Sequence, residues 1–374
     1  MVSREDIQRL IHRPSTGRTI LSLFLDMAVN SDNKRTYGIF LAKQKGRFSE
    51  LDSDREAHHR VELGAALARA ERWIEENFDE SNKGLALYAE IGGAWTEGFQ
   101  VGVSLQNRLD LADHPIIAPL AEVVETQPHY GVLVIDRDSL RMVGLRSGQV
   151  LTEHVATGQA YPTPNDVQAG GEAQKDYQKR KEQERRHFFK DFAREALEYD
   201  QRYQPDHLIL LGTEENVKPF TECLPAQLRA KIVHSAPGPA GPRTSDIVQR
   251  LLPFFGQRAR AEETRAVQVL HDRVRNRHFA AAGVHQTLEQ LQEGKVETLV
   301  IARDLRTPGA QCQKCGFFLD RRDGACPYCG GELREGIDLA EAMVRLAEEQ
   351  EIPVEFVSQQ ALADVSGAGA LLKF

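Results

Sequence analysis

Four of the five cysteines stand in two Cys-x-x-Cys pairs, Cys312 with Cys315 and Cys326 with Cys329, and ten residues separate the pairs. Two pairs of thiolate sulfurs at this spacing are the donor set that Zn²⁺ takes in closed tetrahedral sites. A glycine follows the second cysteine of each pair and suits the tight turn that directs backbone N–H groups at sulfur. Four sulfur ligands leave no open position for water or substrate, so the spacing predicts a structural zinc site rather than catalytic zinc or a redox dithiol.

The second candidate region is a glycine-containing loop followed by a basic segment. Residues 157–172 hold three Gly and two Pro and have almost nothing to bury, which is typical of a functional or disordered loop. The stretch from Lys175 to Lys190 then carries seven Lys/Arg against three acids. It is either a solvated surface helix or an arm that follows nucleic-acid phosphates. The basic residues of this stretch before Phe188 are Lys175, Lys179, Arg180, Lys181, Arg185 and Arg186, and the loop that precedes them ends in Gly170, Gly171 and Glu172.

Motifs of the familiar nucleotide-driven and hydrolytic enzymes are missing from the sequence. It contains no Gly-x-x-x-x-Gly-Lys-Ser/Thr loop, no Gly-x-Gly-x-x-Gly after a strand and no Gly-x-Ser-x-Gly. The twelve histidines include no His-x-x-x-His pair beside a helical acid. No catalytic residue is assigned on these grounds, and we expect a protein that is not an enzyme.

Composition limits the classes of protein further. Lys and Arg number 47 against 55 Asp and Glu, a net charge of −8, which excludes a generally basic protein that coats nucleic acid but allows local basic patches. No apolar run is long enough to cross a membrane, and the first residues lack the apolar core of a secretory signal. With so few cysteines, we expect a cytoplasmic protein without membrane contact.

The alternation of strand and helix patterns predicts an α/β fold of three mixed α/β domains. The clearest strands begin at Tyr130 and His207, and a helical stripe runs from Phe188 to Leu197. We expect an N-terminal domain at 1–123, a middle domain at 124–252 with the loop and basic helix, and a C-terminal domain at 253–374. The third domain is expected to be an α-β-α sandwich with the zinc ribbon inserted at 310–332.

Three stretches of this chain resemble the archaeo-eukaryotic class I release factor and Pelota family, in its bacterial branch. They are Tyr130-Gly-Val-Leu-Val-Ile-Asp-Arg-Asp with the following loop and basic helix, the segment from Gly283 to Ile301, and the zinc ribbon with the closing Ser366-Gly-Ala-Gly-Ala-Leu-Leu-Lys-Phe374. The resemblance implies a protein that enters the ribosomal A site and contacts ribosomal RNA with its middle domain. The candidate RNA-binding residues are the loop tip Gly170, Gly171 and Glu172 and the basic residues Lys175, Lys179, Arg180, Lys181, Arg185 and Arg186. The layout of the domains favours a monomer. The resemblance also implies a translational GTPase such as elongation factor Tu as a candidate partner.

The chain departs from termination factors at the tip of its middle-domain loop. Those factors carry Gly-Gly-Gln there, where the glutamine helps to place the hydrolytic water, whereas this chain reads Gly170-Gly171-Glu172. A carboxylate lacks the amide donor and is costly among RNA phosphates. The Asn-Ile-Lys-Ser and Tyr-x-Cys codon-reading signatures are also absent. The pattern is most similar to Balon-type hibernation factors, so we expect a protein that occupies the A site of idle bacterial ribosomes without releasing peptide.

Two alternatives remain open at this stage. One is a ribosome rescue factor or peptidyl-tRNA hydrolase in which Glu172, or Gln168 or Gln174 in a shifted register, positions the water molecule. The other is a module that binds structured RNA away from the ribosome, because the third domain resembles the fold of ribosomal proteins that bind kink-turns.

Overall fold

The computed structural model describes residues 2–49, 54–158, 172–238, 243–321 and 323–373. The chain forms two compact units: unit 1 combines Met1–Thr126 with Gln257–Phe374, and unit 2 is Gln127–Gly256. Several sheets with helices packed on them confirm the predicted mixed α/β fold. In the ranges given above, no helix combines the length and apolar character needed to span a lipid bilayer.

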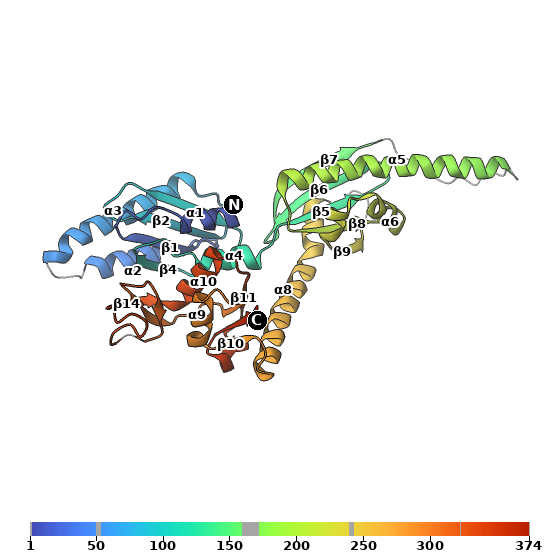
Figure 1. The fold of residues 1–374 in the computed structure, drawn as a ribbon. Coiled ribbons are helices and arrows are strands. Elements are labelled where there is room, and N and C mark those ends of the chain that lie inside the picture. Colours follow the sequence, from blue (N-terminus) through green and yellow to red (C-terminus); the bar gives the residue numbers. More distant parts are fainter. Residues whose placement is uncertain (1, 50–53, 159–171, 239–242, 322, 374) are drawn as a thin grey trace. The chain divides into compact units, whose positions relative to one another are not determined.

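Unit 2 is built on a five-stranded sheet in the order β7-β6-β5-β8-β9 (Figure 1). The central strand β5 pairs antiparallel with β6 and parallel with β8, and all six of its residues are buried. Near-continuous apolar sequence is typical of a strand that is covered on both faces. The strands are β5 Tyr130–Ile135, β6 Ser139–Arg146, β7 Gln149–Thr157, β8 His207–Gly212 and β9 Ile232–Pro237.

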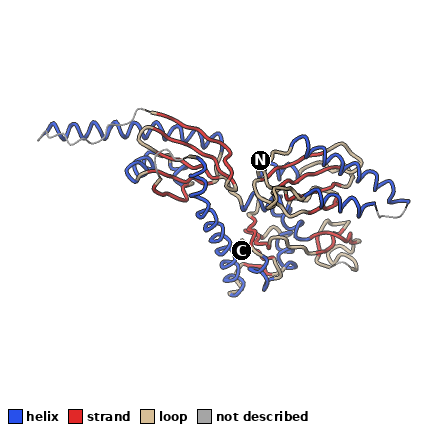
Figure 2. The backbone as a smooth tube through the Cα atoms, turned by 180° about the vertical axis from the view of Figure 1, so that it is seen from behind, coloured by secondary structure: helices blue, strands red, loops and turns tan. Residues whose placement is uncertain are grey.

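Helix α5, Glu172–Tyr203, follows β7 and is anchored on this sheet by its second half. Phe188, Phe189 and Phe192 are buried in one cluster with residues of β5, β6 and β8, as the apolar stripe predicts. Figure 2 shows the first half of the helix running past the end of the strands. The other helices that begin in unit 2 are α6 Glu214–Cys223, α7 Ala226–Ala230 and α8 Thr244–Arg275.

The N-terminal part of unit 1 contains an antiparallel sheet in the order β3-β2-β1-β4. Strands β1 and β2 are almost wholly buried, and the apolar face of α3, which includes Leu63 and Leu67, packs in one core with them. The elements are α1 Arg4–Ile11, β1 Ile20–Asp26, α2 Tyr37–Ser49, α3 Asp54–Asn77, β2 Gly84–Glu90, β3 Thr96–Val101, β4 Arg108–Ala112 and α4 Ala118–Thr126.

The C-terminal part of unit 1 contains a second four-stranded sheet, β10-β16-β11-β15, and a small sheet, β13-β12-β14. The buried strand β11 pairs parallel with β15 and antiparallel with β16. The elements are β10 Ala280–Ala282, α9 Val284–Gln292, β11 Val296–Ala302, β12 Pro308–Cys312, β13 Phe318–Leu319, β14 Leu333–Asp338, α10 Leu339–Glu349, β15 Val354–Val357, the 3₁₀ helix η1 Gln359–Val365 and β16 Ala368–Leu372.

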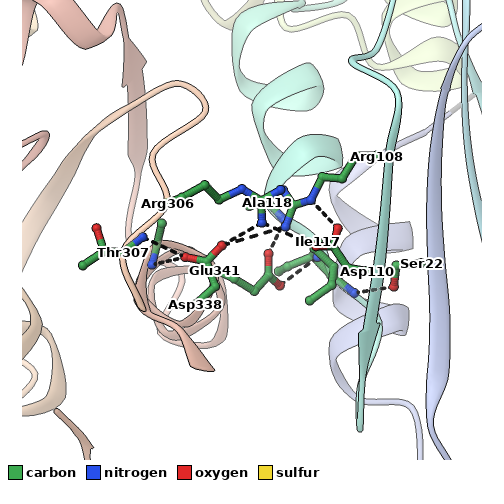
Figure 3. A network of polar contacts seen from close by, with 11 residues as sticks. Ser22, Arg108, Asp110, Ile117, Ala118, Arg306, Thr307, Asp338 and Glu341 are labelled. Carbon is green, nitrogen blue, oxygen red and sulfur yellow. Dashed lines mark hydrogen bonds and ion pairs between the residues drawn. The ribbon is translucent and has the colours of Figure 1, made fainter. Parts of the chain in front are cut away.

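The two parts of unit 1 share a core and a polar junction. Apolar residues of α1, β1 and β2 lie in the same cluster as residues of α9 and α10. Figure 3 shows the buried carboxylate of Glu341 accepting hydrogen bonds from the backbone N–H groups of Ile117, at 2.8 Å, and Ala118, at 2.9 Å. It thereby satisfies donors at the start of α4. The division into three domains stays a prediction, and here its first and third members belong to one compact unit.

Several elements differ from those read from the sequence. Helix α8 continues through Pro253, where we expected the third domain to start, and covers 32 residues. The closing segment, for which the sequence predicts no element, forms strand β16. Helix α2 is not predicted, because the sequence around it is rich in charged residues. Its apolar residues Tyr37, Phe40 and Leu41 pack on the core beside α3.

Candidate functional site

The four predicted metal ligands come together in the small sheet of unit 1. The Sγ atoms of Cys312, Cys315, Cys326 and Cys329 all lie within 4.8 Å of one another. Cys312 Sγ is 3.4 Å from Cys329 Sγ, and Cys315 Sγ is 3.6 Å from Cys326 Sγ. Each of these short distances joins a sulfur of one Cys-x-x-Cys pair to a sulfur of the other pair. The four sulfurs therefore surround one common centre. Four converging sulfurs without a carboxylate or imidazole among them fit a closed tetrahedral metal site.

Two glycine turns set this geometry. Gly316 and Gly330 have φ angles of 78° and 69°, in the left-handed region where a glycine costs least. Their N–H groups donate to the carbonyl oxygens of Cys312, at 2.9 Å, and Cys326, at 2.8 Å, and close one tight turn at each pair. The two turns are equivalent, which explains why both pairs carry the same Cys-x-x-Cys-Gly pattern.

Backbone dipoles prepare one of the sulfurs for metal binding. The N–H group of Cys315, 3.5 Å from the Cys312 sulfur, and that of Lys314, at 3.4 Å, lower the pKa of Cys312 to about 6. A thiolate at neutral pH is the form that binds metal ions. The N–H of Phe317 favours the thiolate of Cys315, but burial and the neighbouring sulfurs outweigh it and raise the pKa of Cys315. A bound cation would favour the thiolate form of both cysteines.

The predicted RNA-binding residues fall at the start of helix α5. The backbone of α5 includes Glu172 and the basic positions from 175 to 186, so these residues share one helix. Of their side chains the structure describes Arg186, which is exposed. Gly170 and Gly171 lie outside the described residues. The assignment of this set to RNA stays a prediction.

An aromatic cluster at the base of the same helix was missed in the sequence. Tyr203 Oη is 2.6 Å from His154 Nε2, and Tyr199 Oη is 2.8 Å from Thr152 Oγ1. The rings of Tyr199 and Tyr203 lie 4.9 Å apart. Two tyrosines at i and i+4 on a helix were the available signal. Their hydroxyl groups join the last turns of α5 to the edge strand β7, so the second half of the helix is held by polar as well as apolar contacts.

Comparisons with known proteins place the middle of the chain in a family. Residues 115–254 match the bacterial archaeo-eukaryotic release factor family 10. The chain is 24% identical to peptide chain release factor subunit 1 of Thermococcus onnurineus over 72% of both chains. It is also 24% identical to the protein of that name from Thermococcus kodakarensis over 83% of both chains. Among solved structures, a model of ribosome-bound archaeal Pelota and ABCE1 shares 14% identity, covers 100% of this chain and 94% of that chain, and has a TM-score of 0.40.

Residues 115–254 thus match a bacterial family of archaeo-eukaryotic release factors, and the chain is similar over most of its length to archaeal release factor proteins. The matched segment contains all of β5 to β9, the residues 159–171 and helix α5. The sequence-based recognition of the family is confirmed. The cysteine cluster lies outside the matched segment.

Proposed function

We propose that this protein binds the ribosome as a release factor homologue and occupies the A site of idle ribosomes without releasing peptide. The sequence Gly170-Gly171-Glu172 carries this proposal. It lies inside the segment that matches the family, and it keeps the two glycines of the release factor tip but replaces the glutamine by a carboxylate. The ability to bind at the peptidyl-transferase centre would then be kept, while the amide that helps to place water would be lost.

The physical chemistry of helix α5 supports a role as the RNA-contacting arm. Its second half is fixed to the sheet by Phe188, Phe189 and Phe192. The first half runs past the strands and carries the basic positions, so cations can meet RNA phosphates without disturbing the core (Figure 1). Phosphate contacts supply affinity that falls steeply with salt. The net charge of −8 would reduce binding to other nucleic acids.

The proposal includes a structural Zn²⁺ ion held by Cys312, Cys315, Cys326 and Cys329. The convergence of four sulfurs supports it. When bound, such an ion supplies folding free energy and no reaction step. A cytoplasmic location and a companion GTPase of translation, such as elongation factor Tu, are part of the same proposal by resemblance to the family.

A salt-dependent binding experiment tests the proposal. Purified protein would be co-sedimented with vacant bacterial ribosomes and with ribosomes carrying peptidyl-tRNA, at 50 to 300 mM salt. We expect saturable binding to vacant ribosomes. Charge reversal of Lys179, Arg180 and Lys181 should weaken it by about a hundredfold or more and flatten its salt dependence.

The matched control reverses the charge of three exposed arginines elsewhere in unit 2, Arg194, Arg229 and Arg250. This control should bind as the wild type does. Equal binding by the wild type and the arm variant, with equal salt slopes, would remove the arm from the proposal. Failure of the wild type to bind ribosomes would remove the proposal itself.

A second candidate is a rescue factor that hydrolyses peptidyl-tRNA. The retained Gly170-Gly171 pair favours it, with Glu172, Gln168 or Gln174 as the residue that would position water. Release of peptide over several turnovers from stalled ribosomes would support this candidate. Absence of release at protein equimolar with ribosomes would exclude it.

A further inference from the structure

The last turn of α8 and the residues that join it to β10 bring cations and aromatic rings together on the surface of unit 1. This segment, residues 273–279, is called the α8–β10 loop below. It carries three arginines, Arg273, Arg275 and Arg277, followed by His278 and Phe279. Every residue from Arg275 to Phe279 is exposed. Cations beside exposed aromatic rings are typical of surfaces that bind nucleic acid.

Hydrogen bonds at the end of α8 fix the backbone of this loop. The N–H group of His278 donates to the carbonyl oxygen of Arg273, at 2.9 Å, and the N–H group of Arg277 donates to that of Val274, at 3.1 Å. This pair of bonds ends a helix with one residue in the left-handed conformation, and the φ angle of Arg277 is 50°. Glycine is the residue that this position favours, so an arginine is held there against its backbone preference.

Phe279 has a strained backbone that burial of its ring does not explain. Its φ angle is 46°, again in the left-handed region, which is a rare conformation for a bulky side chain. In the described ranges, the seven other non-glycine residues with positive φ are all polar or charged. The ring of Phe279 is 45% exposed, so packing offsets little of the strain. Backbone strain of this kind clusters at binding sites.

The two aromatic rings form a small platform. The centres of the His278 and Phe279 rings lie 4.2 Å apart, with an angle of 52° between their planes. The carbonyl oxygen of Phe279 accepts a hydrogen bond from the N–H group of Leu372, at 2.9 Å, which ties the platform to strand β16. Exposed rings that are fixed in this way are a surface on which an unpaired base can stack.

The arginines of the loop differ in how far they are already paired. Arg273 is engaged, because its Nη1 atom lies 3.1 Å from Glu297 Oε2. Arg275 Nη1 lies 3.8 Å from Asp272 Oδ1, and the two side chains are 77% and 69% exposed, so this pair is weak. Within the described part of the chain, no carboxylate lies at ion-pair distance from Arg277. About half a negative charge at the end of the α8 dipole opposes an anion here, and the two exposed arginines exceed it.

We infer that the α8–β10 loop binds single-stranded nucleic acid, with an unpaired base stacked on His278 and Phe279 and a backbone phosphate at Arg277. Arg275 can leave its weak pair with Asp272 and meet the next phosphate. Stacking accepts any base, so the loop selects an unpaired strand rather than a sequence. The loop lies in unit 1 and the basic arm in unit 2, so the inference goes beyond the proposed function and does not depend on it.

Fluorescence titration of the full-length protein tests the inference. The probes are single-stranded decamers of RNA and of DNA, each with 2-aminopurine near its centre, and an RNA duplex of the same length. All titrations use the protein in which Lys179, Arg180 and Lys181 are reversed to glutamate, so that the arm does not dominate the signal. We expect saturable quenching of the single strands and at least tenfold weaker binding of the duplex. The ratio of the RNA and DNA affinities identifies the strand that the loop takes.

Arg277→Gly separates loss of binding from loss of folding. Glycine suits a φ angle of 50°, so this variant should unfold at a higher urea concentration than its parent. It also loses one phosphate contact. We therefore expect about five- to tenfold weaker binding of the single strands and a salt slope that is smaller by about 0.7.

Phe279→Asn tests the stacking platform in the same way. Asparagine tolerates the left-handed region, so the variant keeps the backbone and removes the ring. It should weaken binding about tenfold or more and reduce the quenching of 2-aminopurine, while the salt slope stays unchanged.

Glu351→Gly is the matched control for the relief of strain. Glu351 ends α10 in unit 1 with a φ angle of 55°, and the N–H groups of Glu351 and Ile352 form the same pair of hydrogen bonds as those of Arg277 and His278. This variant should also unfold at a higher urea concentration, but it should not weaken binding.

Three results would overturn the inference. One is no saturable binding of either single strand by the protein with the reversed arm. Another is equal affinity for the single strands before and after Arg277→Gly. The third is equal binding of the duplex and the single strands with quenching that Phe279→Asn does not change, because the rings would then have no part in binding.

Discussion

Glu122, on helix α4, is an acid whose protonation couples to folding near neutral pH. Burial raises the pKa of Glu122 from 4.5 to about 7, despite Arg303, whose Nε atom is 3.5 Å from its carboxylate. Arg303 is shared, because its Nη2 atom also lies 3.3 Å from Glu263. One guanidinium is therefore shared by two carboxylates, so Arg303 lowers the pKa of Glu122 only in part.

The raised pKa predicts a loss of stability as pH rises. Below pH 4.5 the carboxyl group is protonated in both the folded and the unfolded chain. Between pH 4.5 and about 7 the unfolded chain releases its proton first, so the free energy of unfolding falls. Because the side chain is 30% exposed, we expect this loss to be about 1–2 kcal/mol, below the full linkage value. Glu122→Gln should remove it, measured as urea unfolding from pH 4.5 to 8.

Glu263→Gln is a control in which stability should depend on pH in the opposite direction. Burial opposes ionisation of Glu263, but hydrogen bonds from Ser358 and the charge of Arg303 outweigh it and lower its pKa. Its contribution to stability is present above its unfolded pKa and is lost as pH falls. Glu263→Gln should therefore lower stability at neutral pH and have less effect in acid. Identical pH profiles for the wild type and Glu122→Gln would refute the assignment of Glu122.

At the scale of elements, the small sheet β13-β12-β14 depends on the cysteine cluster. Its hydrophobic core consists of little more than Cys312, Leu319 and Cys326. So few apolar residues cannot stabilise a sheet alone, and a bound metal would provide the missing free energy. We expect one Zn²⁺ per chain by elemental analysis.

Replacement of one ligand tests this dependence. Cys312→Ser should lose the metal and unfold the small sheet, seen as faster amide exchange over residues 308–338, while unit 2 keeps its exchange rates. Cys223→Ser is the matched control, because Cys223 lies in unit 2 outside the cluster. Full retention of zinc by Cys312→Ser would contradict the four-sulfur site.

The elements that the sequence predicts well are those with a strong local pattern. Strands β5 and β8 are continuous apolar runs, and the Phe188 stripe of α5 has helical period, so periodicity alone suffices. The cysteine cluster follows in the same way from spacing. Helix α8 is not predicted as one helix from its sequence, because a proline such as Pro253 usually breaks a helix. In the structure, residues of α8 on both sides of Pro253 pack in hydrophobic clusters, and this packing keeps the helix continuous.

Sites that depend on distant segments are not visible in the sequence. The carboxylate of Glu341 caps α4 from more than two hundred residues away. The α8–β10 loop is likewise anchored at Phe279 by Leu372, which no local spacing connects to it. Such residues are ordinary in composition, and only the fold gives them a shared role.

At the scale of the whole molecule, most of the segment that matches the family model lies in one unit and the cysteine cluster lies in the other. Residues 127–254 of the matched segment lie in unit 2 with helix α5, whereas the cysteine cluster and the α8–β10 loop lie in unit 1. Under the proposed function, unit 2 would act on ribosomal RNA and unit 1 would carry the metal. Changes in one unit should therefore leave the intrinsic properties of the other intact, and each proposal can be tested separately.

The proposed function excludes peptide release, and under it the side chain at residue 172 prevents this reaction. Glu172→Gln recreates the Gly-Gly-Gln tripeptide at residues 170–172 and removes a negative charge from the arm. We expect the variant to bind vacant ribosomes more tightly, by about tenfold at low salt, because one repulsion with phosphate is lost. On ribosomes loaded with peptidyl-tRNA it should release peptide above the wild-type level, equally at stop and sense codons, since the codon-reading signatures are absent.

Release is measured with radiolabelled peptidyl-tRNA in a single-turnover assay, with protein in excess. Glu172→Ala is the matched variant, because it removes the charge without supplying an amide. It should share the gain in binding but not the gain in release. If Glu172→Gln and Glu172→Ala release peptide equally, the amide is not the missing group. If the wild type already releases peptide as fast as Glu172→Gln, the carboxylate is competent and the rescue enzyme replaces the dormancy factor as the proposed function.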